Sequence, residues 1–271
     1  NGKINNIISR AHGYDLYFER NTMNYLPFRK FIDNNLDTIF FISQNGKNYY
    51  ESEYPKIGVQ LNCKRRVARL GTYGGEYKKT GKLNERIVLV SCSNINSVKR
   101  LDLIVDVLEK MKRHDIMWYH FGTGELEKKI EQYCKEKLVS GSYKLCGYVD
   151  NKEILKKYKE YNADFFINMS DSEGIPVSIM EAMSCGIPVI ARKVGGMCEI
   201  VNEENGILLE NNNIEDFARR ISLLFTACRE RPDKYEMMCK RAYNTWKEKY
   251  NAENNYDTFY SQMMEGERRD N

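Results

Sequence analysis

The chain lacks the residue patterns that usually bind metal ions. Its 271 residues contain three histidines, no Asp-x-Asp sequence, no Cys-x-x-Cys pair and no Cys/His spacing of the kind that holds zinc. The nearest approach to an Asp-x-Asp sequence is Asp171-Ser-Glu173, in which the third position is a glutamate. We therefore expect no metal site and no bound cofactor.

Charge of a single sign is also scarce. The 42 basic and 38 acidic residues are mixed along the chain and leave a net charge of +4. Proteins that bind nucleic acids gather their basic residues on one face or along one helix. The mixed distribution therefore argues against a nucleic-acid partner.

Long apolar runs and paired cysteines are missing as well. No stretch reaches the length of about twenty apolar residues that a membrane-spanning helix needs. The eight cysteines are scattered, and most lie in apolar segments. Free thiols spread in this way are typical of a reducing cytoplasm, which is where we expect the protein. The first residues resemble the middle of a domain, so we expect the chain to be a piece of a longer protein.

The chain does contain a regular alternation of β-rich apolar runs with segments of helical periodicity. The expected strands are 86–92, 116–121, 144–146, 165–169, 188–191 and 206–209, and the expected helices include 101–111, 125–137 and 152–161. Such an alternation forms right-handed βαβ units around a parallel sheet. We therefore expect an α/β fold with a Rossmann-like, doubly wound parallel sheet, whose ligands collect at the carboxyl ends of the strands.

The residues before Glu85 do not belong to that sheet. Segments 5–9 and 38–42 have the composition of strands, and 78–84 is polar. We expect part of a second Rossmann-like domain, followed by a mobile link or a hairpin.

The most informative segment runs from Ser170 to Ile190. Glu173 lies in the loop after an expected strand, and Glu181 lies on the helix that follows. Pro176 suits the first turn of that helix, where its missing N–H costs nothing. The helix N-terminus between the two carboxylates offers unpaired N–H groups and a positive dipole end to a diphosphate. Each carboxylate could hold the hydroxyls of a different sugar ring, which is the shape of a nucleotide-sugar site.

This segment resembles the signature of the family-4 (group 1) retaining glycosyltransferases, in which two glutamates flank seven residues. The resemblance continues through 194–196, 199–201 and 205–209 and is closest over 86–210. It implies a GT-B fold, in which an acceptor domain precedes a nucleotide-sugar domain. On this basis residues 1–70 are the remnant of the first domain, 71–240 are the second domain, and 241–271 form a closing helix that returns to the first.

The resemblance also implies roles for individual residues. Family members place an arginine and a lysine on one loop facing the diphosphate; Lys99 matches the lysine, whereas Ser93 stands at the arginine position next to the neighbouring cation Arg100. His12 matches a histidine that reaches the transferred sugar. The expected catalytic residues are Glu173, Lys99 and His12, and the expected donor-binding residues are Lys99, Arg100, Gly122, Gly124, Tyr148, Val149, Glu173, Gly174, Ile175, Val177, Ser178 and Glu181.

The reaction implied is transfer of a sugar, with retention, from a nucleotide sugar to a saccharide or lipid-linked acceptor. The donor would be a UDP- or GDP-sugar, no metal would be required, and no protein nucleophile is assigned. The loops look most like those of enzymes of bacterial surface polysaccharide synthesis, so we also expect peripheral contact with the inner face of the membrane.

Three other functions fit parts of the pattern. A GT-B sugar epimerase would share the sheet but would need its own acid and base in the first domain. A phosphorylase would need a lysine bound to pyridoxal phosphate. A non-catalytic nucleotide-sugar-binding module would need the second domain alone.

Overall fold

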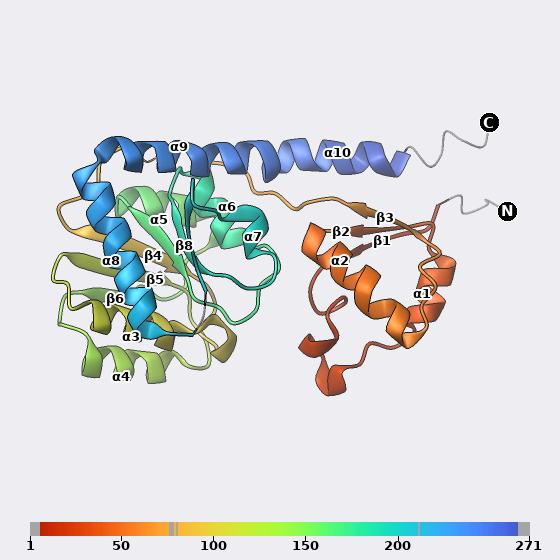
Figure 1. Ribbon diagram of the computed structural model, residues 1–271, viewed down its shortest axis with the longest axis horizontal. Helices are drawn as coiled ribbons and strands as arrows, with labels where there is room; N and C mark the ends of the chain where they lie inside the picture. Colours follow the sequence, from red (N-terminus) through yellow and green to blue (C-terminus); the bar gives the residue numbers. More distant parts are fainter. Residues whose placement is uncertain (1–5, 76–78, 80, 211, 265–271) are drawn as a thin grey trace. The chain divides into compact units, whose positions relative to one another are not determined.

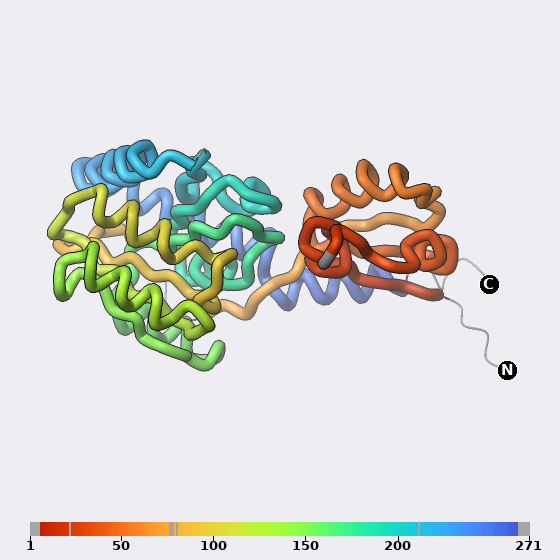
Figure 2. Tube along the Cα trace, turned by 90° about the horizontal axis from the view of Figure 1, so that it is seen from below, coloured from red at the N-terminus to blue at the C-terminus, as the bar shows by residue number. Residues whose placement is uncertain are grey.

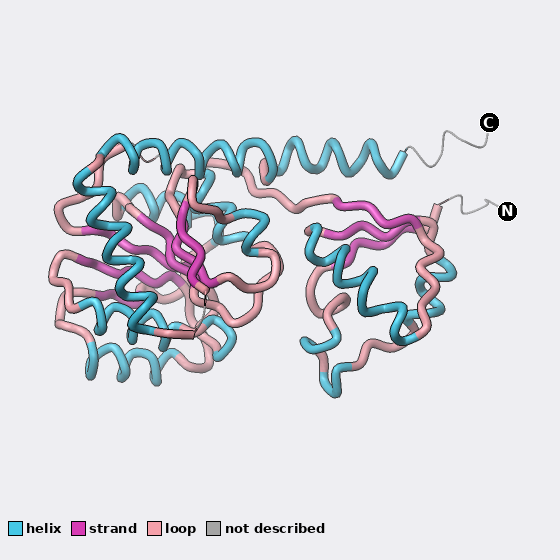
Figure 3. Tube along the Cα trace, in the orientation of Figure 1, coloured by secondary structure: helices cyan, strands magenta, loops and turns pink. Residues whose placement is uncertain are grey.

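The computed structural model describes residues 6–75, 79, 81–210 and 212–264, and the chain divides into two compact units. The first unit comprises Asn1–Gly71 and Lys249–Asn271, and the second comprises Thr72–Glu248. Each unit has its own parallel sheet, drawn in magenta in Figure 3. The structure divides the chain after Gly71 and after Glu248, whereas the sequence led us to expect domain boundaries after residues 70 and 240.

The second unit is built on a six-stranded parallel sheet with the order β6-β5-β4-β7-β8-β9. Strands β4, β5, β6 and β8 of this sheet are labelled in Figure 1. Its strands are β4 (Ile87–Cys92), β5 (Ile116–Phe121), β6 (Tyr143–Leu145), β7 (Phe165–Asn168), β8 (Val189–Arg192) and β9 (Gly206–Leu209). Its helices are α3 (Leu101–Met111), α4 (Glu127–Lys137), α5 (Ile154–Glu160), α6 (Val177–Ser184), α7 (Met197–Ile200), α8 (Ile214–Glu230) and α9 (Pro232–Lys249). Numbered from β4, the order is 3-2-1-4-5-6, which is that of the dinucleotide-binding Rossmann fold. The predicted doubly wound α/β fold is confirmed.

Helices cover both faces of this sheet because its strands bury side chains on both sides. Successive residues of a strand point to opposite faces. The ring of Phe165 lies 5.1 Å from that of Phe225 in α8, whereas the ring of Phe166 lies 6.3 Å from that of Tyr158 in α5. Helix α3 packs beside α8 on the first of these faces (Figures 1 and 2). The continuous apolar runs of the sequence are therefore strands buried on both sides.

One described residue of the segment that we expected to be a mobile link or hairpin is buried instead. Lys79 places its Nζ 2.8 Å from Oδ1 of Asp164, and the two side chains are 2% and 0% exposed. Asp164 also accepts hydrogen bonds from the amide side chain of Asn84 at 2.7 Å and from the N–H of Val88 at 2.8 Å. The expectation was wrong here because the partner of Lys79 lies much later in the chain, immediately before β7. Residues 78 and 80 lie outside the described part.

Two local expectations need smaller corrections. The helix expected at 152–161 begins as a 3₁₀ turn (Asn151–Glu153) before α5. Pro176 is not inside the first turn of α6 but caps it, with φ −68° and ψ 132°, so the first helical residue is Val177. The remaining strands and helices of the second unit lie within one or two residues of their expected positions.

The first unit contains a three-stranded parallel sheet with the order β1-β2-β3. Its elements are β1 (Ile8–Ala11), β2 (Thr38–Phe41), β3 (Lys64–Val67), α1 (Arg29–Asn35), α2 (Gln44–Glu53) and α10 (Ala252–Met264). Helix α10 returns to this sheet late in the chain: the ring of Phe259 packs edge-on against Phe40 at 4.9 Å, and the guanidinium of Arg10 lies 4.7 Å from its centroid. The first strand begins later than we expected, at Ile8, and Asn5 lies outside the described residues.

Candidate functional site

Lys99 and Glu173 meet where the strand order of the second unit reverses. Lys99 ends a 3₁₀ turn (Ser97–Lys99) after β4, and Glu173 lies in the loop after β7. Strands β4 and β7 are neighbours in the sheet. Because connections leave such a pair toward opposite faces, a crevice opens beyond their carboxyl ends, and α/β proteins bind their ligands there.

The side chains of Lys99 and Glu173 form an ion pair across this crevice. Lys99 Nζ lies 2.7 Å from Glu173 Oε1, with the side chains 26% and 9% exposed. The amide side chain of Asn168, the last residue of β7, donates to the same oxygen at 3.3 Å. An incoming anion therefore shares the partly exposed ammonium of Lys99 with the carboxylate of Glu173.

Backbone hydrogen bonding and packing fix the positions of Lys99 and Glu173. The side chain of Asn96 accepts a hydrogen bond from the N–H of Lys99 at 3.2 Å and closes the 3₁₀ turn. The loop of Glu173 packs against the loop after β8, in which Gly195 has φ +50°. A Cβ on Gly195 would overlap the carbonyl oxygen of Glu173. A glycine is required there because only glycine allows this approach of two backbones.

Glu181 lies on α6 and is 6% exposed. Burial raises the pKa of its carboxyl group to about 7, against the lowering effect of a hydrogen bond from the side chain of Asn151. The nearby thiol of Cys92 has its pKa raised to about 12, mainly by burial and further by the charge of Glu181. That thiol therefore stays protonated, whereas Glu181 changes its charge near neutral pH.

Glu181, Glu173 and Lys99 line one cavity of about 540 Å³. The full set of lining residues is Cys92, Ser93, Asn94, Lys99, Phe121, Gly122, Tyr148, Val149, Asn151, Glu173, Pro176, Val177, Ser178 and Glu181. A nucleotide-sized ligand fits a cavity of this size, since small-molecule sites occupy roughly 300–1,000 Å³.

The N-terminus of α6 opens into the same cavity. Val177 and Ser178 are its first two residues, and both line the cavity. The first N–H groups of a helix have no partner inside the helix, and the dipole adds a partial positive charge there. Together with the ammonium of Lys99, these groups make one end of the cavity suitable for a phosphate.

The glycines of the turn after β5 fit closely against the loop that follows β4. Gly122 has φ +135°, and a Cβ there would overlap the carbonyl oxygen of Ser93; a Cβ on Gly124 would overlap that of Ile95. Gly122 N–H also donates to the carbonyl of Gly147 at 2.8 Å. This packing explains both glycines, and only Gly122 lines the cavity.

The structure brings together eight of the twelve expected donor-binding residues: Lys99, Gly122, Tyr148, Val149, Glu173, Val177, Ser178 and Glu181. Tyr148 is 74% exposed, so its ring is free to stack on a flat ligand at the cavity rim. Gly124, Gly174, Ile175 and Arg100 are not among the described residues that line the cavity. The guanidinium of Arg100 is instead hydrogen-bonded to Asp102 and Asp171.

His12 belongs to the first unit, where it is exposed. Its backbone N–H donates a hydrogen bond to Asp15 Oδ1 at 2.8 Å. Its expected role stays a prediction.

Sequence reasoning missed several polar groups at the site. Asn168 could have been noticed as a polar residue that ends an apolar strand, but nothing in the sequence marks Asn151 or Cys92. His120 is fully buried on β5, with Nδ1 2.8 Å from the Ser91 hydroxyl, and burial lowers its pKa to about 4. It is therefore a neutral ring within the sheet.

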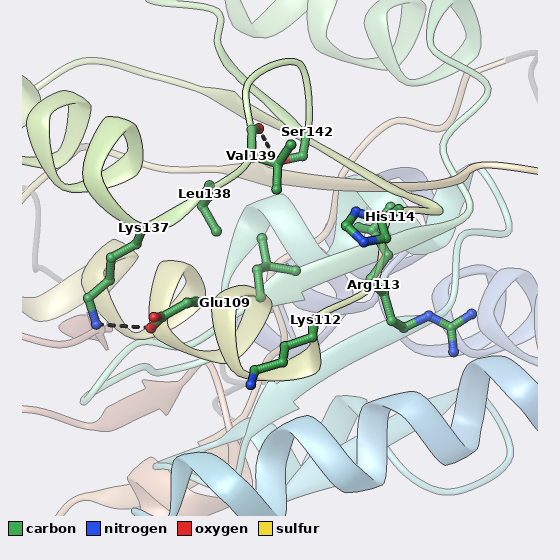
Figure 4. Close-up of a pocket in the computed structure, with 10 residues that line it drawn as sticks. Glu109, Lys112, Arg113, His114, Lys137, Leu138, Val139 and Ser142 are labelled. Atoms are coloured by element: carbon green, nitrogen blue, oxygen red, sulfur yellow. Dashed lines mark hydrogen bonds and ion pairs between the residues drawn. The ribbon is translucent and has the colours of Figure 1, made fainter.

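A second hollow, of about 370 Å³, lies at the opposite edge of the sheet (Figure 4). Its walls come from the ends of α3 and α4 and the starts of β5 and β6. Lys137 in its wall is paired with Glu109 at 3.1 Å, and Arg113 with Asp115 at 2.6 Å. Lys137 lies in the last turn of α4, where it complements the helix dipole, and Arg113 is paired with a nearby carboxylate, so neither residue requires a ligand.

The described residues also lack two other kinds of feature. No group of three His, Cys, Asp or Glu side chains among them is placed to hold a metal ion. Nor does any described helix combine the length and apolarity that crossing a membrane requires.

The six-stranded sheet and the cavity define a class, that of Rossmann-like domains with a ligand cavity at the switch point of the sheet. The sequence model for "Glycosyl transferases group 1" matches residues 76–245, well over half of the chain. The protein therefore belongs to the group 1 glycosyltransferases.

Individual relatives agree with this assignment. An uncharacterized glycosyltransferase of Methanocaldococcus jannaschii is 28% identical over 219 residues, which are 79% of this chain and 57% of that protein. The O-antigen biosynthesis glycosyltransferase WbnH of Escherichia coli is 30% identical over 221 residues, 79% of this chain and 59% of WbnH. The chain thus spans somewhat more than half the length of these relatives.

Solved structures support the fold. The pneumococcal O-GlcNAc transferase GtfA, in complex with UDP and GlcNAc, matches with a TM-score of 0.78 and 15% identity over 97% of this chain and 53% of GtfA. At this identity the similarity concerns the fold alone.

Proposed function

We propose that this chain binds a nucleotide sugar and belongs to a retaining glycosyltransferase of the family-4 type. The observation that carries the proposal is the arrangement of Lys99, Glu173 and Glu181 around the N-terminus of α6 in one cavity. The sugar would pass to a saccharide or lipid-linked acceptor during bacterial surface polysaccharide synthesis. Such an enzyme of hexosyl transfer would work in the cytoplasm, in peripheral contact with the inner face of the membrane.

Each group of the site has a role in this proposal. Glu181 accepts hydrogen bonds from the ribose diol, and Glu173 orients the hydroxyls of the donor sugar. The diphosphate lies between Lys99 and the N–H groups of Val177 and Ser178. The role implied for His12 is contact with the transferred sugar.

The departing diphosphate gains negative charge as the glycosidic bond breaks, so positive groups fixed at that place lower the barrier. Lys99 and the α6 N-terminus supply them without a metal ion. With Ser93 at the arginine position, Lys99 is the principal cation of the donor site. Cys92 is not a nucleophile in this scheme, because its thiol is protonated.

UDP is the first donor nucleotide to test, because the pneumococcal relative GtfA was solved with UDP and GlcNAc. GDP is the alternative. The relative WbnH acts in O-antigen biosynthesis, which supports a saccharide acceptor of the bacterial surface.

A non-catalytic nucleotide-sugar-binding chain is the second candidate. It is favoured by one observation: the cavity is lined by residues of the second unit alone, within Thr72–Glu248. Such a chain would bind the donor but would neither transfer nor hydrolyse it, so release of free UDP from a bound UDP-sugar distinguishes the two candidates.

The test is a calorimetric screen of UDP, GDP, ADP and their sugars against the folded chain, with and without EDTA. We expect saturable binding of at least one nucleotide and its sugar, unchanged by EDTA. Binding abolished by EDTA and restored by Mg²⁺ or Mn²⁺ would show that a metal bridges the diphosphate. No binding of any nucleotide to folded protein would refute the proposed function.

A further inference from the structure

Two ion pairs, side by side, join the loop after β4 to the loop after β7. The inner pair is Lys99 with Glu173, at 2.7 Å, and it lines the donor cavity. The outer pair is formed by the next residue of the first loop, Arg100, and by Asp171, whose closest atoms are 3.1 Å apart. Neither member of the outer pair lines the cavity.

The outer pair is supported by a third strand. Arg192, the last residue of β8, is 8% exposed, and its Nη1 donates to the carbonyls of Met169 and Ser170 at 3.2 and 3.3 Å. The same nitrogen forms a close ion pair with the carboxylate of Asp171. Its Nη2 donates to the side chain of Asn212 at 2.6 Å. One guanidinium thus fixes three consecutive residues of the loop that carries Glu173.

A backbone hydrogen bond completes the connection. The N–H of Asp171 donates to the carbonyl of Val98 at 2.9 Å, directly between the two loops. The carboxylate of Asp171 therefore forms ion pairs with Arg100 and Arg192, while its backbone N–H bonds to Val98, the residue before Lys99. Arg192, Asp171 and Arg100, together with this backbone hydrogen bond, link the end of β8 to the loop after β7 and that loop to the loop after β4.

This arrangement has a consequence for the proposed donor site, and the inference rests on that proposed function. A diphosphate that accepts a hydrogen bond from the ammonium of Lys99 competes with Glu173 for the charge of that group. The inner pair, which ties the two loops together, is therefore weakened when the ligand binds. The outer pair contacts no part of the cavity and is left intact.

We propose that Arg192 and Asp171 form a strut, a fixed link that holds the Lys99 and Glu173 loops in register when a diphosphate weakens the inner ion pair. Both are positioning residues, since neither touches the cavity. Arginine suits the task, because its planar fork can donate to two carbonyls, a carboxylate and an amide oxygen at once. A lysine, with a single ammonium on a flexible stem, could meet only part of this set.

The first test needs no ligand and measures amide hydrogen exchange in Arg192→Met. Because the Asp171 amide bonds to Val98 across the two loops, it reports on the strut directly. We expect faster exchange at Asp171 and in 168–174 and 93–100, with the central strands unchanged. The matched control is Lys193→Met, which removes the neighbouring cation and its exposed pair with Glu210. Exchange at Asp171 equal to that of the wild type or the control would overturn the strut.

The second test measures affinity for UDP and for uridine in the same variants. If Lys99 is no longer held in place, the affinity for UDP should fall roughly tenfold. The affinity for uridine, which lacks the diphosphate, should change little. A variant that was only less stable would bind both ligands normally while folded. Equal weakening of UDP and uridine, or no weakening of either, would contradict the positioning role.

Two further variants keep the test decisive if Arg192→Met folds poorly. Asp171→Asn keeps the shape of a side chain that is 45% exposed and should reproduce the selective loss of UDP affinity. Arg192→Lys should recover only part of the wild-type affinity. Because the two residues act through one connection, the double variant should lose no more than the larger single loss; additive losses would overturn the strut.

Failure of the strut and failure of the proposed function give different results. A wild-type chain that ignores UDP and every other nucleotide refutes the donor site, yet the exchange experiment still decides whether Arg192 and Asp171 hold the two loops together.

Discussion

Glu181 is the residue of the site whose carboxyl group changes its charge near neutral pH. Its pKa of about 7 compares with an ordinary value of 4.5, and burial is the main cause. Between these values the folded protein holds a proton that the unfolded chain has lost, so stability falls as the pH rises through this window. Above pH 7 the buried charge costs up to about 3 kcal/mol.

We therefore predict that Glu181→Gln raises the free energy of unfolding at about pH 8 much more than at about pH 5. Denaturant melts of the two proteins at both pH values measure the difference. The ionised carboxylate is also the better acceptor for ribose hydroxyls, so uridine affinity of the wild type should rise with pH through about 7 and that of the variant should not. A variant with the wild-type pH dependence would assign that titration to another group.

Glu173 gives a second prediction, with an unusual sign. The carboxylate of Glu173 neutralises Lys99 and would repel a diphosphate. Glu173→Gln should therefore bind UDP more tightly, by several-fold, corresponding to about 1 kcal/mol. It should also lose most of any preference for the UDP-sugar over UDP, since the sugar hydroxyls lose a charged acceptor. Calorimetry with both ligands measures the two effects, and weaker UDP binding would show that Glu173 does not compete for Lys99.

At the scale of the elements, the position of Glu173 depends on the loop after β8. Gly195 has φ +50°, and any side chain there would overlap the Glu173 carbonyl. Gly195→Ala should lower the free energy of unfolding by about 1–3 kcal/mol and weaken UDP-sugar binding, because the Glu173 loop must move. Thermal melts and titration with the sugar measure both.

A matched control separates the two causes of this effect. Gly141 also has a positive φ, of +79°, but a Cβ there would meet nothing within 4 Å. Gly141→Ala therefore shows the cost of the backbone conformation alone, and it should leave ligand binding unchanged. If both variants behaved alike, close packing against Glu173 would not be what fixes the loop.

The elements of the second unit could be predicted from the sequence because each is a local pattern. Strands such as Ile116–Phe121 are apolar runs, and helices such as Leu101–Met111 repeat apolar residues at helical spacing. Tertiary partners could not be predicted in this way. Lys79 follows polar residues and gives no sign of the buried Asp164 that it meets.

The same limit applies to the candidate site. Glu173 and Glu181 were expected because they lie in one run of residues that resembles a family signature, and Lys99 was expected because its loop resembles the family's phosphate loop. Arg100 was expected to face a phosphate, yet its side chain is committed to Asp102 and Asp171. Whether a cation faces the cavity depends on carboxylates from other loops, and no local pattern carries that information.

At the scale of the whole molecule, the division into two units separates the residues of the proposed function. The cavity-lining residues all lie within Thr72–Glu248, whereas His12 lies within Asn1–Gly71. Nucleotide binding is therefore expected to need only residues of the second unit, and transfer to need both.

The central claim is that the cavity holds a diphosphate at Lys99. Its most direct test is calorimetry of UDP and uridine with the wild type and with Lys99→Ala. Losing a charged hydrogen-bond donor costs roughly 1.5–3 kcal/mol, so UDP affinity should fall about ten- to a hundredfold, while uridine affinity stays within about twofold. An unchanged UDP affinity in Lys99→Ala would contradict the account, because the cation that meets the diphosphate would then lie elsewhere.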